Sequence, residues 1–339
     1  MSKRRNIRQT DNLDQGSAAV KTLPAPTAQG SADVKTLPAS EGLAGPHPED
    51  RLRRRHRLNI RLRLRRKKRY VVALYGDSIS KGIVWDDESG RYKVLTANYA
   101  TILSQRLKGT LSNRAMFGMT MGKATTRSVK DLDAMKPDER PDMVLVEYGG
   151  NDCDFDWEAI ARDPAAYHGP KTDISLFREL LRALIVRFSN RHVLPVLLTL
   201  PPLDADRYFA WVSRNTPDAA ANILSWLGSV SKIYWWQERY NAAILEVAAE
   251  TGTHVIDVRS AFLREPDYRD FLCSDGIHPN GEGHALIATR VGDWLERFCG
   301  RMLREHPEDT AKSISTKPLP SEPIFSMHLP SDKKDSDRV

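Results

Sequence analysis

The chain has 339 residues, a net charge of +7 at neutral pH and three cysteines, at positions 153, 273 and 299. This length suits one enzyme-sized domain with added tails. An odd number of isolated cysteines argues against a disulfide framework and a cysteine metal site, and no stretch approaches the ~18 apolar residues that a membrane span requires.

The first 69 residues differ in composition from the rest. Residues 1–50 are rich in Ala, Pro, Ser and Gly and contain a duplicated segment, which predicts a disordered low-complexity arm. Residues 51–69 hold 12 Lys or Arg and no acid; subtracting these charges from +7 leaves −5, so the basic character is local. Three interpretations of this Arg-rich segment remain open: contact with nucleic acid phosphates, contact with an anionic membrane surface, or a solvated extension without a specific partner.

From residue 70 onward, short apolar strands alternate with longer amphipathic helices. Strands are expected at 70–75, 143–148, 192–200 and 254–258, and helices at 94–107, 174–188, 233–250 and 284–298. Pro195 suggests that its strand lies at an edge or contains a bulge. This alternation predicts an α/β domain over residues 70–303, with a parallel sheet covered on both faces. Residues 304–339 are polar and predict a second disordered tail.

Three short stretches carry polar side chains that could act together in one site. Ser78 follows the first apolar run, Asn151 follows the strand expected at 143–148, and Asp275 and His278 lie three residues apart. A serine nucleophile needs a base, a group that orients the base, and donors for the oxyanion. We therefore expect Ser78 to attack a carbonyl carbon, His278 to transfer the proton, and Asp275 to hold the imidazole. Taken singly, each stretch is also typical of an ordinary turn.

Taken together, the stretches resemble the SGNH family, also called GDSL hydrolases. The matching blocks are Gly76-Asp77-Ser78 with Gly82 four residues later, Gly149 to Asp152, and Asp275 to Pro279. The resemblance covers about residues 70–303. It implies a flavodoxin-like, three-layer α/β/α sandwich with a mainly parallel sheet, and a serine esterase or lipase activity.

The resemblance also implies an oxyanion hole. Its donors would be the backbone N–H groups of Ser78 and Gly118 and the side-chain amide of Asn151. Glycine suits such a position because a backbone amide can approach a ligand closely where no Cβ intervenes. Gly122 is a competing candidate for this glycine, because the residues that flank Gly118 are not those most common at this block of the family.

The predicted function is hydrolysis of a carboxylic ester or thioester of a small or medium substrate, without metal or other cofactor. Two alternatives remain open: a carbohydrate O-deacetylase with the same site, and a non-catalytic binding protein tethered by residues 51–69 to nucleic acid or an anionic membrane. The acidic run from Asp152 to Asp156 begins like a calcium loop, but Trp157 stands where that loop needs glycine. A cytoplasmic location is expected, because no apolar signal segment precedes Tyr70.

Residues 201–236 hold four of the seven tryptophans of the chain. One interpretation is a cap or wall around an acyl pocket. The other is an ordinary helical insertion whose aromatic side chains pack on the core.

Overall fold

The computed structural model describes residues 64, 67–214, 217–300 and 302–303, apart from the side chain of Cys299. All of them belong to one compact unit of the chain. The predicted arm (1–50), most of the Arg-rich segment (51–69) and the predicted tail (304–339) lie outside the described residues.

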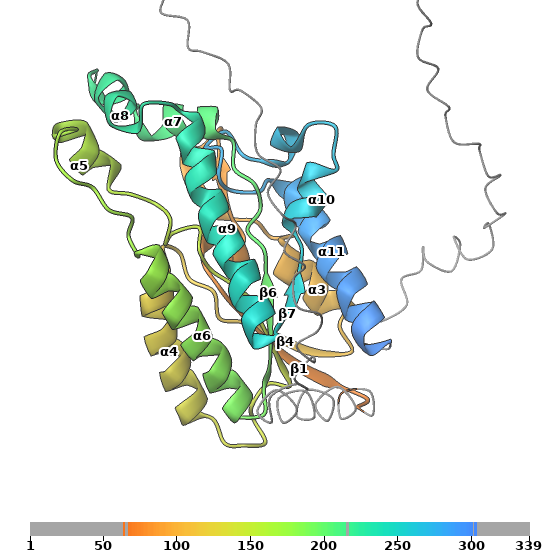
Figure 1. Ribbon diagram of the computed structural model, residues 1–339. Helices are drawn as coiled ribbons and strands as arrows, with labels where there is room; N and C mark the ends of the chain where they lie inside the picture. Colours follow the sequence, from red (N-terminus) through yellow and green to blue (C-terminus); the bar gives the residue numbers. More distant parts are fainter. Residues whose placement is uncertain (1–63, 65–66, 215–216, 301, 304–339) are drawn as a thin grey trace, which may run out of the picture. The chain divides into compact units, whose positions relative to one another are not determined.

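Five parallel strands form the central sheet, in the order β4-β1-β5-β6-β7 (Figure 1). Numbered along the chain without the separate hairpin, this order is 2-1-3-4-5, the flavodoxin-like order. The predicted fold class is therefore confirmed. The strands are β1 (Tyr70–Gly76), β4 (Gly109–Asn113), β5 (Met143–Glu147), β6 (Leu194–Leu198) and β7 (His254–Ile256).

Helices cover both faces of the sheet, because the central strands are apolar on both sides. In β1, Val72 and Leu74 join one core cluster, and Ala73 and Tyr75 join the other. The first cluster lies under α3 (Tyr99–Arg106), α10 (Arg259–Leu263) and α11 (Gly281–Cys299). The second lies under α4 (Met121–Ala134), α6 (Ile174–Asn190) and α9 (Ser231–Thr251), on the opposite side in Figure 1.

Shorter elements surround the carboxyl ends of the strands. They are α2 (Ser78–Lys81), the antiparallel hairpin of β2 (Ile83–Asp86) and β3 (Arg91–Val94), α5 (Trp157–Arg162), α7 (Ala205–Val212), α8 (Ala219–Leu227) and the 3₁₀ turn η1 (Tyr268–Phe271). The hairpin corrects the helix expected at 94–107. That helix begins only at Tyr99, where the Asn98 side chain caps it by accepting the Thr101 N–H.

Pro195 does not mark an edge strand. Strand β6 is paired on both sides, with β5 and β7, and Pro195 is in register with Val144. The N–H of Leu194 points toward β5, onto the Asp142 carbonyl, so the position of the missing Pro195 N–H faces the other side. On that side lies β7, which pairs with β6 only from Val196 onward, so the missing N–H of Pro195 costs no hydrogen bond of the sheet.

Core packing begins before the predicted boundary at residue 70. The Leu64 side chain is 0 % exposed and belongs to the core cluster that contains Tyr70. Lys67 forms an ion pair of 2.5 Å with the nearly buried Asp142, and its N–H donates to the Leu64 carbonyl. Leu64 and Lys67, which belong to the Arg-rich segment, therefore pack with the folded unit.

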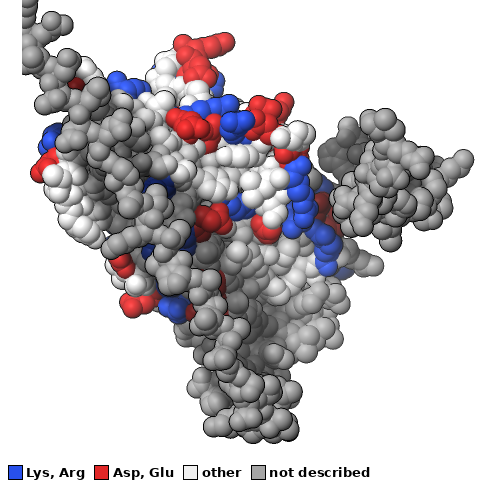
Figure 2. All heavy atoms as spheres, turned by 45° about the horizontal axis from the view of Figure 1, so that its top comes forward, with Lys and Arg blue, Asp and Glu red and all other residues white. Residues whose placement is uncertain are grey.

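Charged side chains of both signs alternate on the described part of the face shown in Figure 2, where the carboxyl ends of the strands come forward. Within the described ranges, no helix is long and apolar enough to cross a membrane.

Candidate active site

Ser78 lies at the switch point of the sheet. It follows β1 and begins α2, next to the loop that leaves β5 in the other direction, which is where open α/β sheets bind ligands. The Asp77 carboxylate caps α2 by accepting the Ile79 N–H at 2.9 Å. Gly82 ends α2 with a left-handed φ of 84°, and a Cβ there would lie 2.6 Å from Asn98. The tight turn that presents Ser78 therefore requires glycine four residues later.

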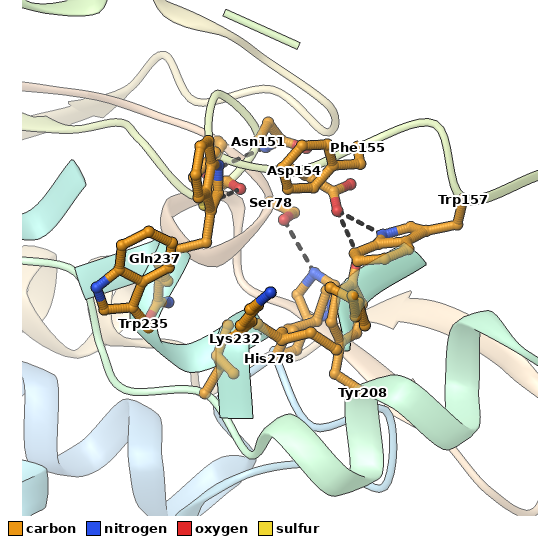
Figure 3. Close-up of a pocket in the computed structure, with 18 of the residues that line it drawn as sticks. Ser78, Asn151, Asp154, Phe155, Trp157, Tyr208, Lys232, Trp235, Gln237 and His278 are labelled. Carbon is orange, nitrogen blue, oxygen red and sulfur yellow. Dashed lines mark hydrogen bonds between the residues drawn. The ribbon is translucent and has the colours of Figure 1, made fainter. Parts of the chain in front are cut away.

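The structure brings Ser78, His278 and Asp275 together across 200 residues of sequence. Nε2 of His278 lies 2.9 Å from Oγ of Ser78 (Figure 3). On the other side of the ring, Nδ1 lies 2.6 Å from Oδ2 of Asp275. Oδ1 of Asp275 accepts the backbone N–H groups of Ile277 and His278, both at 3.1 Å. Burial alone would raise the pKa of Asp275, but the hydrogen bonds from His278 and the backbone hold it below its usual value. Asp275 is thus an anion suited to orient the imidazole.

Two aromatic residues that the sequence analysis did not single out enclose His278. The ring of Tyr92, on β3, lies 5.2 Å from the imidazole in an edge-on arrangement, and that of Phe117 lies nearly parallel to it at 6.5 Å. Burial, followed by the neighbouring Asp275 carboxylate, raises the pKa of Tyr92. No local motif marks either residue, because each reaches the site through the placement of a loop or hairpin.

Asn151 stands beside the nucleophile. Its side chain lines the same pocket as Ser78, and its Nδ2 donates to Oδ2 of Asp77 at 3.1 Å (Figure 3). The second amide hydrogen remains available for a ligand in the pocket. The neighbouring Asp152 is fully buried and accepts the Met121 N–H, which ties the loop to α4. Burial raises the pKa of Asp152 to about 6.

Of the two candidate glycines, Gly118 lies in the loop before α4, whereas Gly122 lies within the first turn of that helix. Gly118 has a left-handed φ of 67°, and a Cβ there would meet nothing within 4 Å. Glycine is therefore favoured at 118 by its backbone conformation, not by contact with protein atoms. The ring centroid of its neighbour Phe117 lies 6.5 Å from that of His278, so the loop that carries Gly118 reaches the neighbourhood of the candidate site.

A cavity of about 350 Å³ opens beside Ser78 and His278, within the size range of small-molecule sites. Its lining is dominated by aromatic and aliphatic side chains from the segment around α5, from α7 and α8, and from the start of α9. The bulkiest are Phe155, Trp157, Tyr208, Trp226, Trp235 and Trp236. Residues 201–236 thus supply a wall of this cavity, and the same segment also packs into a third core cluster. Both interpretations of the segment apply, because Tyr208, Leu227 and Ile233 belong to this cluster and also line the cavity.

The Asp154 carboxylate in the cavity wall is held by neighbouring side chains. The Asp154 carboxylate accepts the Trp157 indole N–H and the Tyr208 hydroxyl, both at 2.7 Å (Figure 3), and pairs with Lys171 at 2.6 Å. Lys232 and Gln237 also line the cavity from α9. Asp154 is thus held as part of the wall, and the residues that the structure describes include no cluster of three potential metal ligands.

Cys153 and Cys273 are free and buried, and Cys153 lines the cavity. Burial raises the pKa of the Cys153 thiol well above its usual value and that of Cys273 to about 11. Neither thiol is therefore set up as a nucleophile.

The chain is similar in sequence to known ester hydrolases. The model of the GDSL-like lipase/acylhydrolase family matches residues 74–286. The chain is 24% identical over 172 residues to "GDSL esterase/lipase CPRD49" of Arabidopsis thaliana, a match that spans 49% of this chain and 60% of that protein.

Solved structures with some likeness include a lipase/acylhydrolase from Enterococcus faecalis (21% identity, 69% of this chain, 96% of that chain, TM-score 0.46). Another is a mutant of Axe2, an acetylxylan esterase from Geobacillus stearothermophilus (18% identity, 70% of this chain, 97% of that chain, TM-score 0.46). Because the family model matches well over half of the chain, the protein belongs to the GDSL-like lipase/acylhydrolase family of ester hydrolases.

Proposed function

We propose that the protein hydrolyses carboxylic esters or thioesters with Ser78 as nucleophile, His278 as general base and acid, and Asp275 as the group that orients His278. The observation that carries this proposal is the continuous line of short contacts from Ser78 Oγ to His278 and on to Asp275, at the edge of an apolar cavity.

In this mechanism Nε2 of His278 takes the Ser78 proton while Oγ attacks the carbonyl carbon. Asp275 accepts the Nδ1–H and stabilises the imidazolium that forms. The oxyanion is held by the Ser78 and Gly118 backbone N–H groups and by the free Nδ2–H of Asn151. His278 then gives its proton to the leaving alcohol or thiol. A water molecule attacks the acyl-enzyme by the same steps in reverse and releases the acid.

The cavity favours substrates with a compact apolar group next to the ester. Its volume of about 350 Å³ lies at the lower end of the range for ligand sites, and its wall is mainly aromatic. An acetyl group alone would leave most of this wall without contacts. We therefore favour a medium acyl chain or an aromatic group over the deacetylation of a carbohydrate, which remains the alternative for the same site.

The test combines labelling with turnover. The wild-type protein should react with a fluorophosphonate probe and hydrolyse p-nitrophenyl esters, with kcat/KM rising from acetate to a medium chain. Ser78→Ala should abolish both labelling and turnover, whereas Ser104→Ala, at an exposed position of α3, should change neither. A Ser78→Ala protein that keeps turnover would contradict the mechanism. A panel in which acetylated oligosaccharides exceed every acyl chain would favour the deacetylase.

For residues 51–69 we propose a salt-dependent contact with nucleic acid phosphates or an anionic membrane surface. The proposal rests on the charge of this segment, since most of it lies outside the described residues. Binding to DNA, RNA or anionic vesicles should weaken steeply with salt and disappear on deletion of residues 1–63, which spares Leu64. A cytoplasmic location remains a proposal; the two free thiols in the described chain are consistent with it.

A further inference from the structure

Two buried carboxyl groups meet directly behind the nucleophile. Asp77 follows β1 and Glu147 ends β5, and Gly76 is in register with Glu147 across these neighbouring strands. Asp77 is 1 % exposed and Glu147 is 2 % exposed, and their side chains are in hydrogen-bonding contact. Two ionised carboxylates in contact away from water would repel each other strongly, so the pair holds one proton.

The donors around the pair decide which carboxyl carries that proton. Asp77 accepts the Ile79 N–H on Oδ1 and the Asn151 amide on Oδ2. Among the described side chains, only the Ser80 hydroxyl donates to Glu147, on Oε2 at 2.8 Å, and the Asp77 backbone N–H also lowers the pKa of Glu147; its buried Oε1 has no hydrogen-bond partner. Burial raises the pKa of both groups, and the Asp77 charge raises that of Glu147 further, whereas the Ile79 and Asn151 amides lower that of Asp77. The proton therefore resides on Glu147.

A one-directional chain of hydrogen bonds follows from this assignment. Ser80 has a single hydroxyl proton, which it gives to Glu147, so the Tyr99 hydroxyl at 2.5 Å must donate to Ser80. Glu147 in turn donates to Asp77. Every group in the chain passes one proton toward Asp77, which has none to give.

The orientation of the Asn151 amide depends on that last point. An ionised Asp77 only accepts hydrogen bonds, so the amide must turn its NH₂ toward it and leave one N–H for the pocket. If Asp77 held the proton instead, it could donate to the Asn151 carbonyl oxygen. The amide could then reverse, and a carbonyl oxygen could face the place where the oxyanion forms.

We propose that Glu147 is a positioning residue: as a neutral acid it donates a hydrogen bond to Asp77, keeps Asp77 an acceptor, and so holds an Asn151 N–H toward the oxyanion. This role rests on the proposed ester hydrolysis at Ser78. It differs from packing alone, because it requires a donor at position 147 and acts through one other side chain.

The test is a double-mutant cycle between positions 147 and 151, read on the kcat of ester hydrolysis. Glu147→Leu removes the donor with little change of volume, and kcat should fall about 10–100-fold with KM little changed, because an oxyanion donor is misplaced. Glu147→Gln restores a donor to Asp77 and an acceptor for Ser80, and kcat should recover to within about threefold of wild type. In an Asn151→Ala background, Glu147→Leu should cost less than about a further twofold, because the group it positions is gone.

The proposal would be overturned if the kcat loss of the double mutant equalled the product of the two single-mutant losses. It would also be overturned if Glu147→Gln had a kcat as low as that of Glu147→Leu. Thermal unfolding checks that each variant is folded. If Glu147→Leu does not fold, Asp77→Asn decides: it places a donor beside Asn151 and should match the kcat loss of Asn151→Ala without adding to it. If Ser78→Ala keeps its turnover, the proposed function itself is wrong, and the two failures are thereby distinguished.

Discussion

Replacing Asp275 with asparagine tests the proposed mechanism through a change in the hydrogen-bonding character of one atom. Oδ1 of Asp275 accepts two backbone N–H groups, from Ile277 and His278, and Oδ2 faces Nδ1 of His278. The asparagine must keep its carbonyl oxygen on the two backbone donors, because an NH₂ group there would face other N–H groups. Its NH₂ then faces Nδ1, which becomes an acceptor, and the ring proton moves to Nε2. An imidazole protonated at Nε2 cannot take the Ser78 proton.

The magnitude follows from the loss of this tautomer and of the charge that stabilises the imidazolium. We expect kcat to fall ~10³–10⁴-fold, or ~4–5.5 kcal/mol of transition-state stabilisation. KM should change little, because Asp275 is fully buried behind His278.

The assay is steady-state hydrolysis of the best p-nitrophenyl ester, with circular dichroism as a check of folding. Asp293→Asn, at an exposed position of α11, is the matched control and should keep wild-type rates. The reasoning would be refuted by a folded Asp275→Asn protein that retains more than about a tenth of the wild-type kcat, since this tautomer argument demands a far larger loss.

Three further predictions test other parts of the structure. Asn151→Ala should lower kcat ~10²–10³-fold with KM little changed, measured on the same ester. Burial lowers the pKa of His284 to about 4, so its protonation favours unfolding and stability is lost as pH falls from about 6.5 toward 4. In urea unfolding, the free energy of unfolding of His284→Leu should therefore rise by ~2 kcal/mol relative to that of wild type when the pH is lowered from 7 to 5. Parallel pH profiles of the two proteins would contradict this. Asp152, whose raised pKa acts in the opposite direction, is present in both proteins and does not affect the difference. Leu64→Ala should cost ~2–5 kcal/mol of unfolding free energy, against less than ~0.5 for the partly exposed Leu224→Ala; equal losses would mean that residue 64 lies outside the core.

The prediction for Leu64 revises an expectation drawn from composition. A run of Arg and Lys is typical of a solvated segment, so the sequence predicts that the domain starts at residue 70. Leu64 nevertheless lies in the core, and Lys67 pairs with Asp142. Removal of residues 1–69 would delete both contacts, so we expect it to lower the stability of the folded domain, whereas removal of residues 1–63 spares them.

The sequence alone determined the class of fold and the groups that meet at the candidate site. Apolar runs of strand length alternate with helices, and the polar motifs come directly after two of the runs. In a parallel sheet those carboxyl ends share one edge, so Ser78 and Asn151 had to converge there, and the short Asp275–His278 spacing places the base and its orienting group on one turn.

Only the tertiary structure decided what surrounds these groups. Tyr92 and Phe117 lie beside His278, Glu147 meets Asp77 across two strands, and His284 is buried against Tyr99. Tyr92, Phe117, Glu147 and His284 stand in none of the motifs. Their roles arise from burial and from pairing between segments far apart in the chain; in the proposed arrangement, the donors around the two carboxyl groups place the proton on Glu147. A local sequence pattern indicates the periodicity of a helix or strand. It does not indicate which distant side chain will pack against that element and exclude water from it.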